Sequence, residues 1–398
     1  MKAAAKWPSL PLTEAFWFQE GPGVRNWQFT TSGIKLLNVA NIEKGGTLNL
    51  EKTDRHLDET EVAKKYSHFL VDAGDLVIAS SGISFDDDGL LRTRGAFVRG
   101  EHLPLCLNTS TIRFKPLDGV SDLRFLRLWL NGREFRSQIT KLVTGTAQQN
   151  FGPSHLKATK ITLPPLAEQR RIAEVLDRAE ALRAKRRAAL AQLDSLTQSL
   201  FLDLFGDPRP NTKSWPVKSL KELGKVKTGG TPPGAKPGMF GGPIPFVTPG
   251  DLESDEPVKR TVTEEGAAEA ETVRAGAALV CCIGATIGKM GKAAQRSAFN
   301  QQLNAVEWAT GVDDDYGLGV LRFFKPQIAT WGASTTLPIL KKSSFEKIEI
   351  PVPPIPLQRE FARRVTAVEA LKTAQRASLA ELDALFATLQ HRAFRGEL

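Results

Sequence analysis

The stretch LPPLAEQR at residues 163–170 returns as VPPIPLQR at residues 352–359, an offset of 189 positions. The same offset holds further along the chain, where AQLD at 191–194 matches AELD at 380–383. Self-similarity at a fixed spacing indicates a duplicated architecture, because each copy must form the same local structure. The chain is therefore built from two copies of one plan.

Upstream of this stretch the two copies diverge. VDAG at 71–74 echoes VRAG at 273–276, and the Trp-Pro pair at 7–8 echoes the pair at 215–216. The offsets drift, as loops of unequal length require. We expect four segments in the order globular, helical, globular, helical. Their boundaries are residues 1–163, 164–207, 208–352 and 353–398.

Each helical segment begins with a proline pair, at 164–165 and at 353–354. Proline suits the first turn of a helix, because its missing N–H would have no intrahelical partner there. The first segment ends in FGDP at 205–208, where glycine can take the left-handed cap conformation and proline cannot continue the helix. The sequence predicts a helix over about 166–204, roughly 58 Å long at ~1.5 Å per residue.

Apolar residues recur every three or four positions along both helices, which is the pattern of a coiled-coil seam. The predicted seam of the first helix is Ile172, Val175, Ala179, Leu182, Arg186, Ala189, Leu193, Leu196 and Leu200. The seam of the second is Phe361, Arg364, Val368, Leu371, Gln375, Ser378, Leu382, Leu385 and Leu389. Arg186 and Gln375 share one register position, where a polar residue can fix register at a cost in stability. The helices are expected to pair with each other; the alternative is that each packs on its own globular domain.

The globular segments show short strand-like runs broken by turns rich in glycine and proline. Strands are predicted at 34–39, 76–79 and 111–114, and again at 245–248, 278–283 and 304–308. Helices are predicted at 123–139 and 318–331. The expected fold class is α+β, with two similar globular domains alternating with two long helices.

The charge balance points to a polyanionic partner. The 398 residues carry a formal net charge of +9, and both globular segments have a small excess of Lys and Arg. This distribution suits two separate polyanion-binding surfaces joined by a structural element. The alternative is a basic protein with no nucleic-acid role.

Cellular location is constrained by what the sequence lacks. No run of about 18 apolar residues is present, and the first ten residues have no apolar core of a secretory signal. The three cysteines, Cys106, Cys281 and Cys282, form no CxxC pair and do not suggest a disulfide framework. We expect a cytoplasmic protein without membrane contact.

No familiar catalytic motif stands out. GATIGKM at 284–290 resembles a phosphate-binding loop, but it has one residue too few between its glycines and lacks the Ser/Thr that would hold Mg²⁺. The five histidines are scattered without metal-ligand spacing. The aspartate runs at 86–88 and 313–315 are expected to be solvated loops, and Cys281-Cys282 is expected to lie in a core. The sequence therefore predicts neither a catalytic residue nor a metal site.

Basic residues near predicted turns are candidates for phosphate contacts, because cations neutralise the nucleic-acid backbone. In the first domain they are Arg92, Arg94 and Arg99. In the second they are Lys225, Lys227, Lys236, Lys289, Lys292, Lys341 and Lys342, with the hydroxyl of Thr228 beside them.

A second kind of candidate lies in TGTAQQNF at 144–151. Its candidate contact residues are Thr144, Gln148, Gln149 and Asn150. Gln and Asn side chains can donate and accept together at an adenine edge in the major groove. The alternative is that this loop is only a hinge between the globular domain and the helix.

Taken together, these features resemble the specificity (S) subunit of type I restriction–modification systems over essentially the whole chain. The resemblance is carried by the duplicated plan, by PPLAEQRRIA at 164–173 with PPIPLQR at 353–359, and by the helix ends LFGDP at 204–208 and FRGEL at 394–398. Trp215 followed by KTGGTP at 227–232 is similar to the usual opening of a target recognition domain.

The resemblance implies two target recognition domains, each reading one half of a split, asymmetric double-stranded DNA site. It implies that the two helices pair as an antiparallel coiled coil that spaces these domains. It also implies two modification subunits that bind S-adenosylmethionine and methylate adenine, and two restriction subunits that use ATP and Mg²⁺. The cofactors belong to those partners, so none is expected on this chain.

One departure and two rival functions remain. The amides at 148–150 correspond to Leu-Pro-Ile at 337–339, so the second domain would read DNA differently. A self-sufficient nuclease or methyltransferase would need a catalytic carboxylate cluster or an Asn/Asp-Pro-Pro-Tyr/Phe motif, and we find neither in the sequence. A purely structural coiled-coil adaptor would not need two unlike basic domains.

Overall fold

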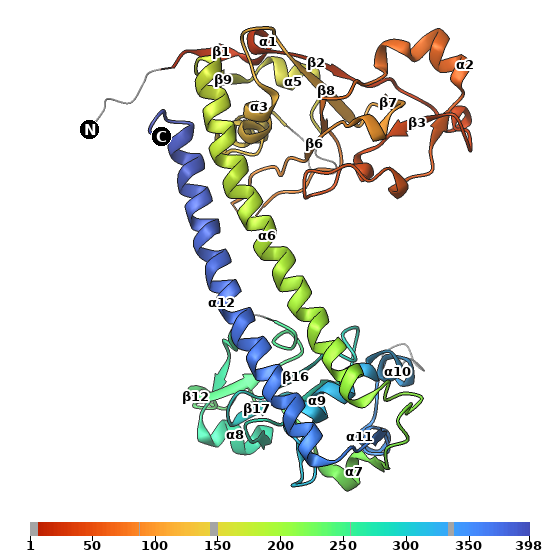
Figure 1. Cartoon of the computed structure of the whole chain (residues 1–398). Coiled ribbons are helices and arrows are strands. Elements are labelled where there is room, and N and C mark those ends of the chain that lie inside the picture. The colour runs from red at the N-terminus through yellow and green to blue at the C-terminus, as the bar shows by residue number, and fades with distance from the viewer. Residues whose placement is uncertain (1–6, 87, 144–149, 255, 333–337) are drawn as a thin grey trace. The chain divides into compact units, whose positions relative to one another are not determined.

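The computed structural model describes residues 7–86, 88–143, 150–254, 256–332 and 338–398, in two compact units. Unit 1 is Met1–Lys185 with Leu379–Leu398, and unit 2 is Arg186–Ser378. Two long helices, α6 (Leu166–Phe205) and α12 (Ile355–Ala393), each contribute to both units (Figure 1).

Unit 1 contains a globular part of short strands and helices. Its strands are β1 (Ser9–Pro11), β2 (Phe16–Glu20), β3 (Ile34–Leu37), β4 (His56–Leu57), β5 (Leu76–Ala79), β6 (Gly95–Phe97), β7 (Leu105–Leu107), β8 (Thr111–Pro116) and β9 (Lys160–Thr162). Its helices are α1 (Leu12–Ala15), α2 (Glu59–Glu61), α3 (Leu123–Leu130), α4 (Arg133–Leu142) and α5 (Pro153–Lys157).

Unit 2 also contains a globular part of short strands and helices. Its strands are β10 (Val217–Ser219), β11 (Gly224–Thr228), β12 (Phe240–Val247), β13 (Thr261–Val262), β14 (Thr272–Val273), β15 (Ala278–Cys281), β16 (Met290–Lys292), β17 (Ser297–Phe299), β18 (Leu303–Trp308) and β19 (Glu349–Pro351). Its helices are α7 (Leu220–Leu223), α8 (Glu264–Ala270), α9 (Asp314–Phe323), α10 (Lys325–Trp331) and α11 (Lys342–Phe345).

The sheets of the two units have the same topology, except that the second sheet of unit 2 has one additional strand, β14. The antiparallel sheet β2-β8-β5-β6 of unit 1 corresponds to β11-β18-β15-β16 of unit 2. The second sheet, β4-β3-β7, corresponds to β13-β12-β17-β14, and the ribbon β1-β9 corresponds to β10-β19. In each second sheet one pair is parallel, β3 with β7 and β12 with β17. The predicted α+β fold of two similar domains, each followed by a long helix, is confirmed.

Each unit packs its globular part on segments of both long helices. The core of unit 1 includes Ile172 from the start of α6 and Ala393 from the end of α12, both fully buried. The core of unit 2 includes Phe201 from the end of α6 and Phe361 from the start of α12, whose rings meet edge to face at 5.4 Å. The helices therefore pack on the globular cores as well as on each other, so the two alternatives considered for their packing are not exclusive.

A buried glutamine fixes the start of each long helix. The side chain of Gln169 accepts from the backbone N–H of Asp122 at 2.9 Å and donates to the carbonyls of Val120 and Pro164. Gln358 repeats this set, accepting from the N–H of Asp313 at 2.8 Å. Both glutamines are fully buried. The glutamine that recurs in the duplicated stretch therefore has the same structural role in both copies.

The two helices also contact each other within each unit, and they run antiparallel there. In unit 1, Arg183 pairs with Asp383 at 2.5 Å and lies over the ring of Phe386. In unit 2, Arg186 donates to the side-chain oxygen of Gln375 at 2.8 Å, and Lys372 pairs with Asp194 at 2.9 Å. The two polar residues at one register position thus bond to each other.

The seam follows a slightly different stripe from the one expected. Ile172, Ala179, Phe361 and Val368 are buried, and Val175, Leu193, Leu200, Leu382 and Leu389 are half-buried. Leu182, Leu196, Leu371 and Leu385 are instead 41–53% exposed. Their successors, Arg183, Thr197, Lys372 and Phe386, are less exposed. Long side chains such as Arg183 and Lys372 can bury their aliphatic stems, so a search for apolar residues selected the neighbouring leucines.

Candidate nucleic-acid interface

In unit 1, polar side chains gather where β3 and β7 end, because parallel strands place their carboxyl ends at one edge. The amide of Asn108, just after β7, donates to the side-chain oxygen of Asn38, just after β3, at 2.7 Å. The hydroxyl of Ser110 accepts from the N–H of Val39 at 3.3 Å. Asn38 is buried, so this network fixes the turns rather than facing solvent.

Unit 2 builds the equivalent edge from different side chains. Asn300, just after β17, donates from its amide to Gln302 at 3.0 Å, and its N–H donates to the carbonyl of Val247 at the end of β12. Thr228 donates to the side-chain oxygen of Asn304 at 2.7 Å. Thr228, a predicted contact residue, is therefore engaged within the domain.

A glycine lets the strand before each edge pass close to it. A Cβ on Gly21, after β2, would lie 2.4 Å from the backbone of Asn108. A Cβ on Gly229, after β11, would lie 2.3 Å from the carbonyl oxygens of Phe299 and Asn300. The first glycine of the Gly-rich loop in unit 2 is thus required, because a larger residue would clash with this edge.

In each unit, the segment that follows two short helices, α3 and α4 in unit 1 and α9 and α10 in unit 2, is hydrogen-bonded at this same edge. The N–H of Phe151 donates to the carbonyl of Ser80, after β5, at 2.9 Å, and the N–H of Leu340 donates to the carbonyl of Cys282, after β15, at 2.8 Å. One residue earlier, Asn150 accepts from the N–H of Gly82 at 3.3 Å, whereas Ile339 forms a β-bridge with Ile283. The candidates Thr144, Gln148 and Gln149 lie outside the described residues.

The arginine candidates of unit 1 fall in two places. Arg92 and Arg94 lie on the β5–β6 connection, where Arg94 donates to the carbonyl of Gly82 at 3.4 Å. Gly82 is also the partner of Asn150, so these candidates are brought together. Arg99 lies beyond β6 and pairs with Glu101 at 3.5 Å, with both side chains exposed.

The lysine candidates of unit 2 are spread over several elements, and most have acidic partners. Lys227 contacts Glu271 at 3.2 Å and Glu307 at 3.4 Å, and its side chain is only 13% exposed. The other pairs are Lys236 with Glu265, Lys292 with Asp315, and Lys342 with Glu346. Within the described part of the chain, Lys225, Lys289 and Lys341 have no ion pair. These three are the best placed to meet an external anion.

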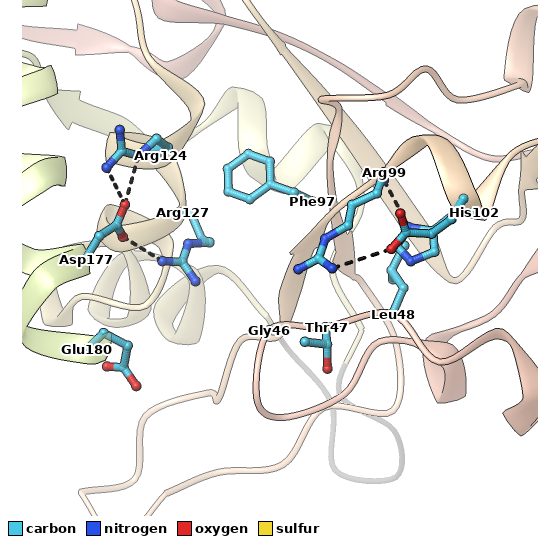
Figure 2. Close-up of a pocket in the computed structure, with 11 residues that line it drawn as sticks. Gly46, Thr47, Leu48, Phe97, Arg99, His102, Arg124, Arg127, Asp177 and Glu180 are labelled. Atoms are coloured by element: carbon cyan, nitrogen blue, oxygen red, sulfur yellow. Dashed lines mark hydrogen bonds and ion pairs between the residues drawn. The ribbon is translucent and has the colours of Figure 1, made fainter. Parts of the chain in front are cut away.

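Unit 1 also contains a charged pocket of about 550 Å³, which the sequence did not predict (Figure 2). Asp177 of α6 accepts from Arg124 and from Arg127 of α3, at 2.8 and 2.9 Å. Arg99 faces this group across the pocket beside Phe97 (Figure 2). Arginines and carboxylates alternate around it, so no single sign of charge dominates. The residues come from segments far apart in sequence, and no local motif signals them.

The residues weighed for catalysis have structural roles. Asp313 caps α9, and Asp86 pairs with Arg136. Cys281 and Cys282 are buried, and burial raises the pKa of Cys282 to about 12, so its thiol stays protonated. The GATIGKM stretch forms the turn before β16 and ends at Met290, the first residue of that strand. Among the described residues, no cluster of three or more His, Cys, Asp or Glu could hold a metal ion.

Comparison with known proteins identifies the family. The family described as "Type I restriction modification DNA specificity domain" matches residues 34–192 and 212–383. Because these matches cover most of the chain, the protein belongs to this family of type I restriction–modification specificity (S) subunits. Subunits of this family supply DNA specificity and are non-catalytic within their complexes.

Individual relatives are distant. The MjaIX specificity subunit of Methanocaldococcus jannaschii is 28% identical over 158 residues, covering 38% of this chain and 37% of that protein. The chain matches between 37% and 56% of the length of its curated relatives.

Two solved structures share the fold. The S subunit from M. genitalium superposes with a TM-score of 0.61 at 16% identity, covering 99% of this chain and 97% of that one. A chain from a structure addressing complex assembly and conformational transition of the type I R-M system gives 0.59 at 19% identity, with full coverage of both. Among the described residues, no helix is long and apolar enough to cross a membrane.

Proposed function

We propose that this chain reads a bipartite, asymmetric DNA site, with residues 1–163 reading one half and residues 208–352 the other. The observation that carries this is one topology repeated with different side chains at equivalent places. Asn150 and Ile339 occupy the same position relative to β5 and β15, yet one is an amide and the other is apolar. Domains that share a scaffold but differ at the loops suit two different half-sites.

The partners follow from the family. The chain would join two modification subunits carrying S-adenosylmethionine and two restriction subunits using ATP and Mg²⁺, all in the cytoplasm, and would itself hold no cofactor. Residues 164–207 and 353–398 would act as the spacer. The duplicated helix starts, with exposed Arg170 and Arg359, offer two similar surfaces for two copies of one partner.

The test is to co-express the chain with the methyltransferase encoded beside it and to map the methylated adenines. We expect two methyltransferase copies per chain by mass measurement, and one split sequence. Exchanging residues 1–163 for the matching domain of a relative should change one half of that sequence only. If both halves change together, or no methyltransferase associates, the proposal is overturned.

A further inference from the structure

A hollow of about 450 Å³ opens in unit 1 beside the connection between β5 and β6. It is rimmed by four cations from three separate segments: Lys44, Arg92, Arg94 and Arg136. The remaining lining residues are Gly82, Ile83, Ser84, Thr93 and Asn131. None of these described lining residues is acidic, so the hollow presents positive charge with amide and hydroxyl groups between.

The cations of this basic hollow differ in how they are held. Arg136 donates to the carbonyl of Leu91 at 2.8 Å and is paired with Asp86, whose carboxyl pKa is lowered by that bond. Lys44 and Arg92 are exposed and have no ion pair or side-chain hydrogen bond with any described residue. The rim therefore combines one braced guanidinium with two cations that are free to meet an anion.

The position of the hollow links it to Asn150, the described member of the amide-rich candidate set. Arg94 and Asn150 both bond to Gly82, one through its carbonyl and the other through its N–H. The amide of Asn150 and the cationic rim thus adjoin at one residue. Contacts to bases give specificity, while contacts to phosphates fix the register of a protein on the duplex.

Unit 2 does not repeat this set of cations at the equivalent connection. The β15–β16 connection spans only residues 282–289, where unit 1 has residues 80–94. Two nearby lysines have acidic partners, because Lys292 pairs with Asp315 and Lys325 pairs with Glu253, and among the described residues of the connection itself Lys289 is the one basic side chain. The longer connection with its cluster of cations is therefore a feature of the first domain.

We infer that the basic hollow binds a backbone phosphate of the half-site read by the first domain, with Lys44 and Arg92 as the contacting cations. This inference rests on the proposed function, since it assigns a role within DNA binding. The ligand is a phosphodiester of duplex DNA. A carboxylate-rich surface of the methyltransferase is the competing occupant.

The test compares the double variant Lys44→Ala/Arg92→Ala with Lys52→Ala/Lys64→Ala, both in complex with the methyltransferase. All four side chains are exposed and without described ion pairs, so neither variant removes a fold contact. Binding to a duplex carrying the mapped site and to a scrambled duplex is measured over a series of salt concentrations. Each phosphate contact contributes about 0.9 to the slope of log affinity against log salt.

We expect the K44A/R92A complex to lose about 1 to 2 from that slope while keeping its preferred sequence. The K52A/K64A complex should keep the wild-type slope. An unchanged slope for K44A/R92A overturns the inference, as does loss of methyltransferase assembly at unchanged slope, which would assign the hollow to the partner. If the wild-type complex does not distinguish the two duplexes, the proposed function is overturned. The difference in salt slope between the K44A/R92A and K52A/K64A complexes still tests whether the hollow binds a phosphate.

Discussion

At the scale of single residues, Lys225 and Lys227 show how burial separates similar side chains. They lie two positions apart on β11, yet Lys225 is exposed, and Lys227 is enclosed by Glu271, Glu307 and the carbonyl of Thr272. A lysine held by two carboxylates is occupied in the folded domain. Its charge therefore contributes to the stability of the domain more than to binding an outside anion.

We predict that Lys227→Ala lowers the free energy of unfolding by about 1–3 kcal/mol, because it leaves the partly buried carboxylate of Glu307 and the exposed one of Glu271 without their cation. Lys225→Ala should change stability by less than about 0.5 kcal/mol. It should weaken DNA binding, because an exposed, unpaired cation is lost. Chemical denaturation and DNA titration of both variants test this contrast. Equal stability of the two variants would contradict the role assigned to Lys227.

The buried glutamines Gln169 and Gln358 carry a second residue-scale prediction. Changing either to Leu removes three hydrogen bonds and leaves buried backbone groups unpaired, so each change should cost about 1–3 kcal/mol. Gln192→Leu, at an exposed position of α6, is the matched control and should be near neutral. A shift in melting temperature no larger than that of the control would show that these bonds do not hold the helix starts.

At the scale of elements, the paired helices carry polar residues at their shared seam. Arg186 and Gln375 bond to each other, while Lys372 and Arg183 bond to acids on the opposite helix. A polar contact of this kind stabilises less than packed apolar residues would, but it penalises shifted registers. The helices therefore gain a defined alignment at some cost in stability.

We predict that Arg186→Leu with Gln375→Leu raises the free energy of unfolding by about 1 kcal/mol, because two apolar side chains replace a partly buried polar pair. Arg186→Ala alone should lower it by about 1 kcal/mol, because Gln375 loses its partner. Lys185→Leu, at an exposed site on the same helix, serves as control. Thermal unfolding followed by circular dichroism distinguishes these variants. A double variant less stable than the single one would argue against this account of the seam.

Prediction from sequence succeeded best where a local pattern determines the element. The strand predicted at 76–79 is β5 itself, and the long helix expected over 166–204 is observed as Leu166–Phe205. Both follow from residues adjacent in sequence, such as an apolar run or a proline start with a glycine end.

Features assembled from segments far apart in the chain could not be predicted from the sequence. The basic hollow draws Lys44, Arg92 and Arg136 from three parts of unit 1, and only the arginines of the β5–β6 connection were candidates. Lys227 was a candidate for binding because nothing in the sequence reveals that Glu271 and Glu307 enclose it. Whether a cation is free depends on tertiary packing, which residue spacing does not encode.

At the scale of the whole molecule, α6 and α12 are the elements that the two units have in common. Each helix is continuous from one unit into the other, and the antiparallel contacts recur on both sides of the division. A change of length in both helices therefore alters an element that belongs to each unit. Under the proposed function, we expect the spacing between the half-sites to depend on these helices.

We predict that one heptad added to each helix, after Arg186 and after Gln375, shifts the preferred gap between half-sites and leaves each half-site unchanged. A matched heptad keeps the 3-4 seam in phase and adds roughly 10 Å of helix, about three base pairs of duplex at ~3.4 Å each. The added DNA also turns by about a third of a helical repeat, so each reader must regain its groove. That mismatch should weaken binding, or bend or untwist the DNA at a cost of a few kcal/mol.

The measurement is methylation of a duplex library in which only the gap between the half-sites varies. A heptad added to α6 alone is the control, because it breaks the alignment of the pair and should abolish activity at every gap. The doubly extended chain should prefer a longer gap than the natural chain, with lower overall affinity. An extended chain that assembles with the methyltransferase yet modifies only the original gap would show that the helices do not set the spacing. The flexibility of the DNA or the partner subunits would then have to set it.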